Sequence, residues 1–597
     1  MLGASIKPWI KAQRWGLGVT LVMLVSSLWL YACTPISWTP GSDGFYSWIY
    51  ARSLAFDGDI DFKNDYALCG DPFRIGVDRG TGHPDNIFYS GPALVWTPLL
   101  VVLRLVLRGL PPAASCGPPF STIVLGFSPL LGALTAWLCY RLARRHFSDG
   151  VAALAVALLV LAGPALKIAT CLPSYSHTCD ALFVSALLVL TARAAERPLQ
   201  RLRWAWVALA LTACIVQRLS NVTFAAVPLV AAAATLSSRR RESLIVAATI
   251  GAGMLAGLGA CGAIYRYLYG SPFVFTHGPY FVHLAHAHPF LLLFDEVQGV
   301  FFCTPALWLS VLGLVPALRD RPLRRLLLPL CAIAFIEVYL SSAALDWAPS
   351  RRLTNLSPLG VLLACYPLRS LAAWSRLRPR GLATAGLLLA SPFCVASLGY
   401  AWGAPRGLVP GSTRFFSVLN ETLGRMAALP AEIVFSLRYH LPRDRFGEAI
   451  TPSWYTRDFR SLAWIRRDLV FTNPRLARLM AGFSGSTGGA KLIGPRAHLV
   501  FATQWPFATH AIVRAAGPTG ARLRLGESRV LGEPRWFGES KSLPATSGVI
   551  EFAIPPGEFS SGIHDLVFEV SGDDLRETLI VSLSLDDRTQ RPPAFQR

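Results

Sequence analysis

The chain has 597 residues, of which 53% are hydrophobic and only 15% are charged, and this composition excludes a protein whose main solvent is water. The formal net charge of +21 does not indicate a nucleic-acid-binding face, because the basic residues lie in short clusters between apolar runs, as topology signals do. The apolar runs are long enough for helices of about 20 residues that cross a hydrocarbon core of roughly 30 Å. We therefore predict a polytopic α-helical membrane protein.

The first apolar run covers residues 15–32 and is typical of an uncleaved anchor, because it is long and lacks a small-residue cleavage site. Lys7, Lys11 and Arg14 precede it, so the positive-inside bias places the N-terminus in the cytoplasm. The segment that follows is then extracytoplasmic, which in a bacterial inner membrane means periplasmic.

The charge pattern decides how residues 89–107 are interpreted. A span here would place the basic cluster at 141–145 outside the cytoplasm, so we predict a juxtamembrane or re-entrant element and a second span at 120–140. Every later basic cluster then falls inside, which favours about eleven spans and an extracytoplasmic C-terminal part. The remaining spans are predicted at about residues 150–172, 179–195, 204–219, 221–236, 243–265, 297–317, 325–345, 355–373 and 381–402.

The composition changes near residue 403, where Arg, Pro, Glu and Asp begin to interrupt every apolar run. We predict a transmembrane domain over 1–403, with its first external loop at 38–119, and a mixed helix and loop region over 404–494. Short alternating segments between Gly, Pro and Asp turns predict a small β-sandwich over 495–597. A rigid cap and a role in sugar or acceptor recognition are both open for this last domain.

The twelve cysteines show no CxxC spacing and no cluster with histidine, so no metal site is predicted from them. Most lie inside apolar spans and read as small buried hydrophobes. Cys69 and Cys116 fall outside the spans on one face, and we predict a disulfide between them.

Acidic, imidazole and guanidinium groups gather on the predicted external face, where charges beside a bilayer are costly unless they have a role. A carboxylate there can accept the proton of an attacking hydroxyl, and arginine can hold a phosphate in a bidentate fork. The set therefore favours transfer from an anionic lipid carrier. The candidate catalytic residues are Asp43, Asp57 and Asp59, and the candidate substrate-binding residues are His83, Tyr89, His177, Arg218, Asn221, Asp346, Arg351 and Arg352.

Other interpretations of these residues are open. The aspartates that alternate with Gly58 and Ile60 also fit a Ca²⁺-binding or solvated turn. His177 also fits a cap on the fourth span. The two late arginines lie near Trp347, where interfacial anchoring competes with phosphate binding. The four histidines between 277 and 288 are more typical of interfacial side chains than of metal ligands.

Several of these segments resemble a known family. The specific part of the resemblance lies in Ser42-Asp43-Gly44, in residues 53–66 and in residues 88–96. These segments resemble the first external loop of bacterial GT-C glycosyltransferases, relatives of protein O-mannosyltransferases and aminoarabinose transferases. Two later stretches, 173–177 and 346–352, are similar to later motifs of the same family.

The resemblance covers about residues 15–400. It implies a polyprenyl-phosphate-linked sugar as donor, an inverting transfer outside the cytoplasm, and Asp43 as the first-loop carboxylate. Relatives of the mannosyltransferase type often carry two adjacent acids here, whereas this chain has Ser42 and Gly44 on either side of Asp43. One carboxylate is left for the base role, and a divalent metal requirement stays open. No cofactor fold is seen, and the acceptor can be a glycan, a lipid or a protein.

Two other functions compete with a GT-C glycosyltransferase. An O-antigen ligase or polymerase type of transferase shares the lipid carrier, but is expected to use a large late external loop rather than an acidic first loop. A transporter of lipid-linked sugars is expected to show inverted repeats and charges near the midplane. Here the charges gather at one face and no internal repeat is visible, which favours transfer.

Overall fold

The computed structural model describes the chain in segments. These are residues 13–34, 38–41, 43–72, 74–78, 80–161, 163–274, 276, 289–294, 300–304, 306–343, 349–374, 469–470, 480–481, 483–486, 489–503, 510–528, 533–554, 562–572 and 578–586. The predicted span at 381–402, Asp346 and the histidines between 277 and 288 lie outside the described residues.

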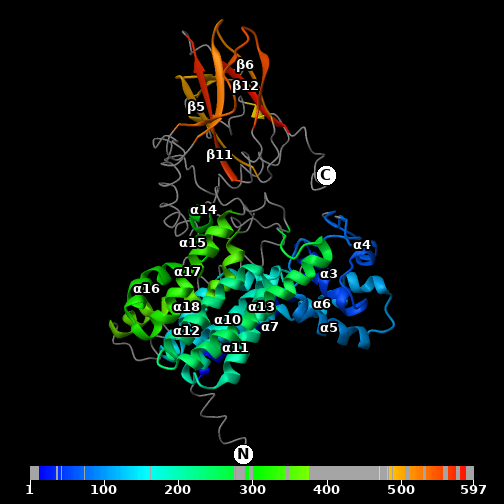
Figure 1. Ribbon diagram of the computed structural model, residues 1–597, viewed down its shortest axis with the longest axis vertical. Coiled ribbons are helices and arrows are strands. Elements are labelled where there is room, and N and C mark those ends of the chain that lie inside the picture. The colour runs from blue at the N-terminus through cyan, green and yellow to red at the C-terminus, as the bar shows by residue number, and fades with distance from the viewer. Residues whose placement is uncertain are drawn as a thin grey trace, which may run out of the picture. The chain divides into compact units, whose positions relative to one another are not determined.

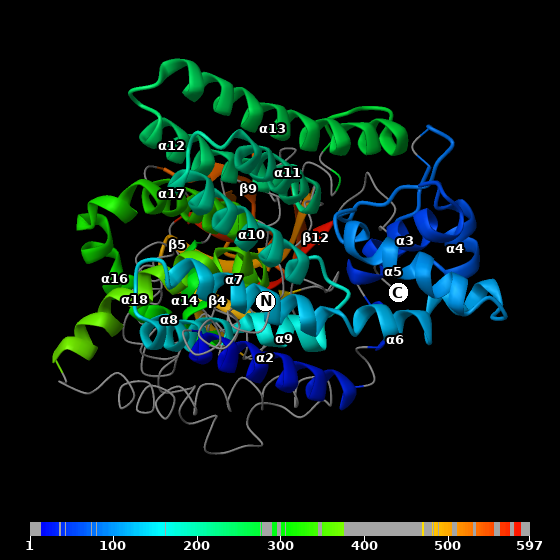
Figure 2. The ribbon, with the colours of Figure 1, turned by 90° about the horizontal axis from the view of Figure 1, so that it is seen from below.

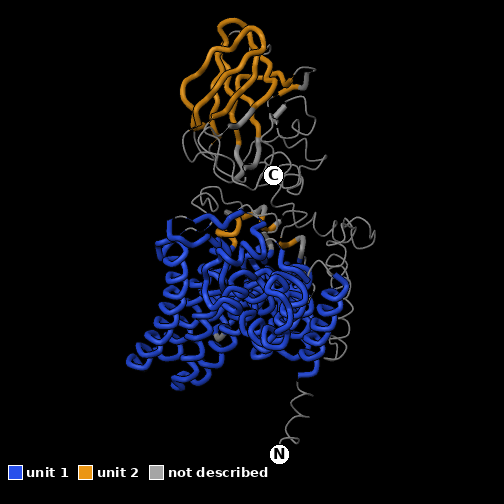
Figure 3. Tube along the Cα trace, turned by 90° about the vertical axis from the view of Figure 1, so that its right-hand side faces the viewer, with its two compact units in different colours: residues 1–276, 303–337, 350–422 blue, residues 277–302, 338–349, 423–597 orange. Residues whose placement is uncertain are grey.

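The chain divides into two compact units, coloured blue and orange in Figure 3. Unit 1 comprises residues 1–276, 303–337 and 350–422, and unit 2 comprises residues 277–302, 338–349 and 423–597. The described part of unit 1 is helical, and all strands lie in unit 2.

Helices account for most of the described residues before position 375 (Figure 1). They are α2 (Arg14–Ala32), α3 (Asp43–Phe56), α4 (Lys63–Cys69), α5 (Ala93–Val106), η2 (Pro112–Cys116), α6 (Phe120–Leu125), α7 (Ser128–Ala143), α8 (Asp149–Val156), η3 (Ala157–Leu161), α9 (Pro164–Cys171), α10 (His177–Glu196), α11 (Arg201–Gln217), η4 (Leu219–Ala225), α12 (Ala226–Thr235), α13 (Arg240–Tyr269), α14 (Pro289–Phe294), α15 (Val300–Cys303), α16 (Leu307–Arg319), α17 (Arg321–Ala343), η6 (Pro349–Leu356) and α18 (Ser357–Trp374).

Five stretches of helix within the described residues are long and apolar enough to cross a membrane, which agrees with a multi-pass membrane protein. Four shorter apolar helices accompany them, among them the 14-residue α5 at the position of the predicted re-entrant element. The five long ones are Arg14–Ala32, Pro112–Ala143, His177–Glu196, Arg240–Tyr269 and Arg351–Ala373.

Close backbone approach holds the helices of unit 1 together. Figure 2 shows α13 lying along α11, and a Cβ atom added at Gly253 of α13 would come within 2.5 Å of the Ala208 carbonyl oxygen of α11. In the same way, a Cβ atom at Gly313 of α16 would meet the Leu363 carbonyl oxygen of α18 at 1.9 Å. Small residues at such contacts are typical of helix packing within a membrane, where van der Waals contact replaces the hydrophobic effect.

The described part of segment 38–119, which was predicted to be the first external loop, is a group of helices that runs from α3 to η2. Cys69, at the end of α4, and Cys116, at the end of η2, form the predicted disulfide with their Cα atoms 5.2 Å apart. Two buried tryptophans, Trp48 of α3 and Trp96 of α5, pack against each other with ring centroids 6.2 Å apart. This packing fixes α3 against α5, so the residue at the start of α3 has a defined position.

The C-terminal strands form two antiparallel sheets, which confirms the predicted change from helix to strand. One sheet has the order β10-β6-β12-β4-β3 with β1 beside β12, and the other has the order β2-β5-β11-β7-β8 with β9 beside β7. The strands are β1 (Leu469–Val470), β2 (Met480–Ala481), β3 (Phe483–Ser486), β4 (Gly489–Leu492), β5 (Arg496–Thr503), β6 (His510–Ala516), β7 (Arg522–Glu527), β8 (Arg535–Trp536), β9 (Lys541–Ser542), β10 (Gly548–Ala553), β11 (Gly562–Ser571) and β12 (Leu579–Asp586).

The alternation that predicted these strands corresponds to burial. Along β7, Leu523 and Leu525 are fully buried, whereas the arginines that alternate with them are not. Phe483 of the first sheet packs edge-on against Phe568 of the second, with ring centroids 5.7 Å apart. Strands β1 to β4 lie before residue 495, inside the region predicted as helix and loop. The sequence does not predict them, because strands of two to four residues are too short to show an alternating pattern.

Candidate functional site

Asp43 is the first residue of α3, and its side chain meets an arginine from the other end of unit 1. The Arg351 Nη2 atom donates to Asp43 Oδ2 at 2.8 Å, across 308 residues of sequence. The Arg351 side chain is only 7% exposed, whereas the Asp43 side chain is 27% exposed. A carboxylate in the first turn of a helix also interacts favourably with the helix dipole. The carboxylate of the pair is therefore the more open of the two groups.

Two aromatic side chains line the arginine side of this pair. The Arg351 guanidinium lies over the Tyr175 ring, 4.9 Å from its centroid, and the His177 ring is stacked with Tyr175 at 6.4 Å. Ser174, just before them, lies directly against Gly44, where an added Cβ atom would come within 2.0 Å of the serine Oγ. The Gly that follows Asp43 is thus required by the close approach of the 172–176 turn.

A second group of charges lies buried behind the pair. Arg218, at the end of α11, contacts Asp180 of α10 (Nη1 to Oδ2, 3.2 Å) and Glu337 of α17 (Nη2 to Oε2, 3.7 Å). All three residues are at most 5% exposed. Arg218 Nη1 also donates to the carbonyl oxygen of Arg352 at 3.0 Å, which links this buried group to η6.

Two asparagines extend the buried group. Asn221 Nδ2 donates to Asp180 Oδ1 at 2.6 Å and to the Cys214 carbonyl oxygen at 2.8 Å. Asn355 Nδ2 donates to Asn221 Oδ1 at 3.4 Å. On the other side of Arg218, the Tyr89 ring lies 5.9 Å from the guanidinium carbon. Arg218, Asn221 and Tyr89, all predicted to bind substrate, therefore do lie close together.

Asp57 and Asp59 lie at the opposite end of α3 from Asp43. The helix has 14 residues, which at 1.5 Å per residue places its ends about 20 Å apart. Arg52, itself buried, pairs with Asp57 at 2.5 Å and also with the buried Asp65; burial raises the pKa of Asp65, and the guanidinium opposes this rise. Ser53 donates to Asp59 at 3.0 Å. The structure thus does not bring these two acids to Asp43.

His83 is also part of a separate contact. Its Nδ1 atom lies 3.1 Å from Asp61 Oδ2, and its ring stacks on Tyr267 near the end of α13, with centroids 4.1 Å apart. Thr81 of the same turn donates to the Leu268 carbonyl oxygen at 3.0 Å. His83 therefore helps to fix the turn at 78–84 on α13, within a part of the loop that does not include Asp43.

The sequence did not predict three further residues that contact the candidate substrate-binding residues Arg218 and Asn221. They are Asp180, Glu337 and Asn355. The first two are ionisable residues inside the predicted spans 179–195 and 325–345, and a charge within a span is itself a signal of function. Searching the spans for such charges, as well as the external loops, would have found them. Among the residues that the structure describes, no group of three or more His, Cys, Asp or Glu side chains could hold a metal ion.

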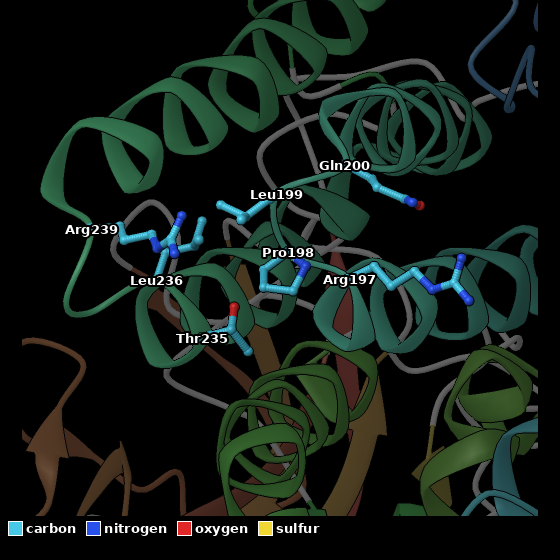
Figure 4. Close-up of a pocket in the computed structure, with 7 residues that line it drawn as sticks. All are labelled: Arg197, Pro198, Leu199, Gln200, Thr235, Leu236 and Arg239. Atoms are coloured by element: carbon cyan, nitrogen blue, oxygen red, sulfur yellow. The ribbon is translucent and has the colours of Figure 1, made fainter.

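A hollow of about 360 Å³ lies at the other end of α10 (Figure 4). It is lined by Arg197, Pro198, Leu199 and Gln200 from the connection between α10 and α11, and by Thr235, Leu236 and Arg239 at the end of α12. Since α10 has 20 residues, this hollow is about 30 Å from His177. It is therefore separate from the Asp43 site.

No protein-family model matches the sequence, and no curated protein matches it. Solved structures similar to the chain include the following three. They are the Archaeoglobus fulgidus oligosaccharyltransferase in its apo form (14% identity, TM-score 0.41, 73% of this chain and 59% of that chain), ArnT from Cupriavidus metallidurans bound to undecaprenyl phosphate (16%, 0.38, 71% and 80%) and the arabinosyltransferase EmbB from Mycobacterium smegmatis (12%, 0.34, 96% and 64%).

All three are GT-C glycosyltransferases. Their identities to this chain are 16% or lower and their TM-scores are below 0.5, so the similarity by itself assigns no activity to this chain. The chain spans only 59% of the length of the archaeal oligosaccharyltransferase. Its own activity, substrates and partners are therefore the subject of the proposal below.

Proposed function

We propose that this chain is a membrane glycosyltransferase that moves a sugar from a polyprenyl-phosphate-linked donor to an acceptor hydroxyl on the extracytoplasmic face. The ion pair between Asp43 and Arg351 carries this proposal. It joins a partly exposed carboxylate to a guanidinium, and these are the groups that deprotonation of a hydroxyl and stabilisation of a phosphate require.

In the proposed reaction, Asp43 accepts the proton of the acceptor hydroxyl while the hydroxyl oxygen attacks the anomeric carbon. The bond between that carbon and the phosphate oxygen breaks, and its electron pair leaves with the polyprenyl phosphate. Arg351 stabilises the phosphate as its charge increases. Because Arg351 is paired with Asp43 before substrate binds, an arriving phosphate competes for the guanidinium and turns the carboxylate toward the acceptor.

Other predicted residues are proposed to bind the donor rather than to take part in the chemical step. Arg352, Asp346 and His177 are proposed to contact the donor, and α5 is proposed to line the groove for the lipid chain. The proposed carrier is of the same chemical class as the undecaprenyl phosphate bound by the Cupriavidus metallidurans ArnT and the dolichol-phosphate bound by the Archaeoglobus fulgidus AglB. The roles of Asp57, Asp59 and His83 stay predictions.

We also propose the topology that this reaction requires. The N-terminus is cytoplasmic in a bacterial inner membrane, eleven helices span it, and the first loop and the C-terminal sheets, arranged as a sandwich, are extracytoplasmic. The disulfide between Cys69 and Cys116 supports the placement of the loop, because disulfides persist in oxidising compartments such as the periplasm.

The test is transfer of a radiolabelled sugar from a panel of polyprenyl-phosphate donors by the purified protein in lipid. Asp43→Asn removes the proton acceptor and keeps the shape, so transfer is expected to fall by about 10²-fold or more. Asp78→Asn, the same change at an exposed position of the same loop, is the matched control and is expected to retain transfer. Equal transfer by Asp43→Asn and wild type, or none across a broad panel, would overturn the proposal in favour of a ligase or a transporter.

A further inference from the structure

The buried group behind the site contains one cation and two carboxylates. Arg218 is 5% exposed, and its guanidinium faces Asp180 on one side and Glu337 on the other. A buried charge is stable only when it is paired and hydrogen-bonded. The positive charge of Arg218 is thus already committed within the protein, which leaves little of it for a substrate phosphate.

The same group is attached to η6 at successive points. Arg218 donates to the backbone carbonyl of Arg352, and Asn355 donates to Asn221, which in turn donates to Asp180. Between these two attachments, Thr354 Oγ1 donates to the Arg351 carbonyl oxygen at 2.9 Å and lies 3.5 Å from the His177 carbonyl oxygen. The segment that carries Arg351 is therefore held on its C-terminal side by α10, α11 and η4.

We infer that Asp180 and Glu337 are positioning residues: they orient Arg218, which holds η6 in the conformation that presents Arg351 to Asp43. Arg218 acts through the Arg352 carbonyl rather than on the substrate. This inference deepens the proposed function and rests on it for the importance of the Asp43 to Arg351 geometry. The arrangement of η6 itself is measurable without any activity.

The two carboxylates differ in how many of their oxygen atoms have a partner. Both Asp180 oxygens have partners, Oδ1 from Asn221 and Oδ2 from Arg218. An amide at this position places a donor against a donor in either orientation, because both partners are donors. Glu337 Oε1 has no hydrogen-bond partner among the described residues, so an amide at 337 keeps the Oε2 contact. Asp180→Asn is therefore expected to release η6 more than Glu337→Gln does.

The experiment measures proximity by cross-linking the full chain in lipid. Cysteines replace Asp43 and Arg351, a short bis-maleimide joins them, and peptide mass spectrometry identifies the linked pair among the native cysteines. This background also removes the ion pair between the two positions, so that the buried group alone holds η6. We expect the yield of the link to fall several-fold when Asp180→Asn is added and to fall less with Glu337→Gln.

Glu196→Gln is the matched control, because Glu196 pairs with Arg145 at 2.9 Å at the far end of α10 and is 57% exposed; its yield should equal that of the parent. Asn355→Ala, which cuts only the outermost link, provides a second test if Asp180→Asn fails to fold, and it too should lower the yield. An unchanged yield in monodisperse Asp180→Asn or Asn355→Ala protein would overturn the inference. A lowered yield in the cross-linking background, together with no sugar transfer by the wild-type chain across the donor panel, would uphold the positioning of η6 and count against the proposed function alone.

Discussion

At the scale of single residues, the geometry of the site depends on contacts with residues that are distant in the sequence. Gly44 follows the candidate base and lies against Ser174 with no room for a methyl group. Arg218 looks like a free phosphate ligand in the sequence, yet it faces two buried acids. In both cases a neighbour that is distant in sequence determines what the residue can do.

Gly44→Ala is expected to destabilise the start of α3 by about 1–3 kcal/mol, the usual result of overpacking, and to displace Asp43. Thermal unfolding in detergent and the transfer assay both measure this effect. Gly41→Ala, three residues earlier, is the matched control, since an added Cβ atom there meets nothing within 4 Å. Wild-type stability and activity in Gly44→Ala would contradict the close contact with Ser174.

Arg218→Met is expected to lower the free energy of unfolding by about 3–5 kcal/mol, because it leaves Asp180 and Glu337 buried without a cation. The yield of folded protein and its unfolding temperature report the loss. Arg145→Met removes an arginine from an ion pair whose carboxylate is exposed, and only a small change is expected. If the two variants were equally stable, the buried charges would not be paired as described.

At the scale of elements, the segment predicted as the first external loop, residues 38–119, contains a turn that contacts a later helix. Asp78 accepts hydrogen bonds from the backbone of Gly80, Thr81 and Gly82, which closes the turn at 78–84. Thr81 and His83 of this turn contact the end of α13. The loop is therefore tied to a helix nearly two hundred residues later.

The closing of this turn is expected to depend on pH. The three backbone N–H donors lower the pKa of Asp78 below its ordinary value, so the charged form stabilises the folded turn. This stabilisation is complete above the ordinary aspartate pKa of about 3.9 and is lost as the pH falls through the lower folded-state pKa. Amide hydrogen exchange of the three donors, Gly80, Thr81 and Gly82, corrected for intrinsic rates, should speed up in this acidic range in wild type. Asp78→Asn should abolish the dependence, and an identical acidic profile in both proteins would contradict it.

The sequence reveals some of these elements and conceals others for physical reasons. Apolar length predicts membrane-spanning helices, and five stretches of the described residues have the required length and composition. Positive-inside bias together with the acidic loop predicts that Asp43 and Arg351 lie on one face, and their ion pair agrees with this. Pairing is concealed, because nothing in the sequence shows that Arg52 engages Asp57 while Arg351 engages Asp43. Asp180 and Glu337 are concealed differently, since each is a single charge within an apolar run. Strands β1 to β4 are too short for a period of two to appear.

At the scale of the whole molecule, one position after α5 and one position after α10 provide a test of the proposed topology. Gly109 of the first loop has open space around it, and Leu199 is 48% exposed beside the hollow of Figure 4. In intact cells, a membrane-impermeant maleimide should label Gly109→Cys, whereas Leu199→Cys should be labelled only after the membrane is opened. Labelling of both from outside would overturn the proposed orientation.

The distance in sequence between Asp43 and Arg351 also determines how long after Asp43 the ribosome adds Arg351. The two residues are 308 positions apart, and this length of chain takes roughly 15–60 s to synthesise at about 5–20 residues per second. In the proposed topology, the nascent chain displays its acid outside the cytoplasm throughout that interval, without the guanidinium that completes the pair. Under the proposed function, the order of translation keeps the chain inactive until its late helices have entered the membrane, and a product released early by the ribosome carries only one member of the pair.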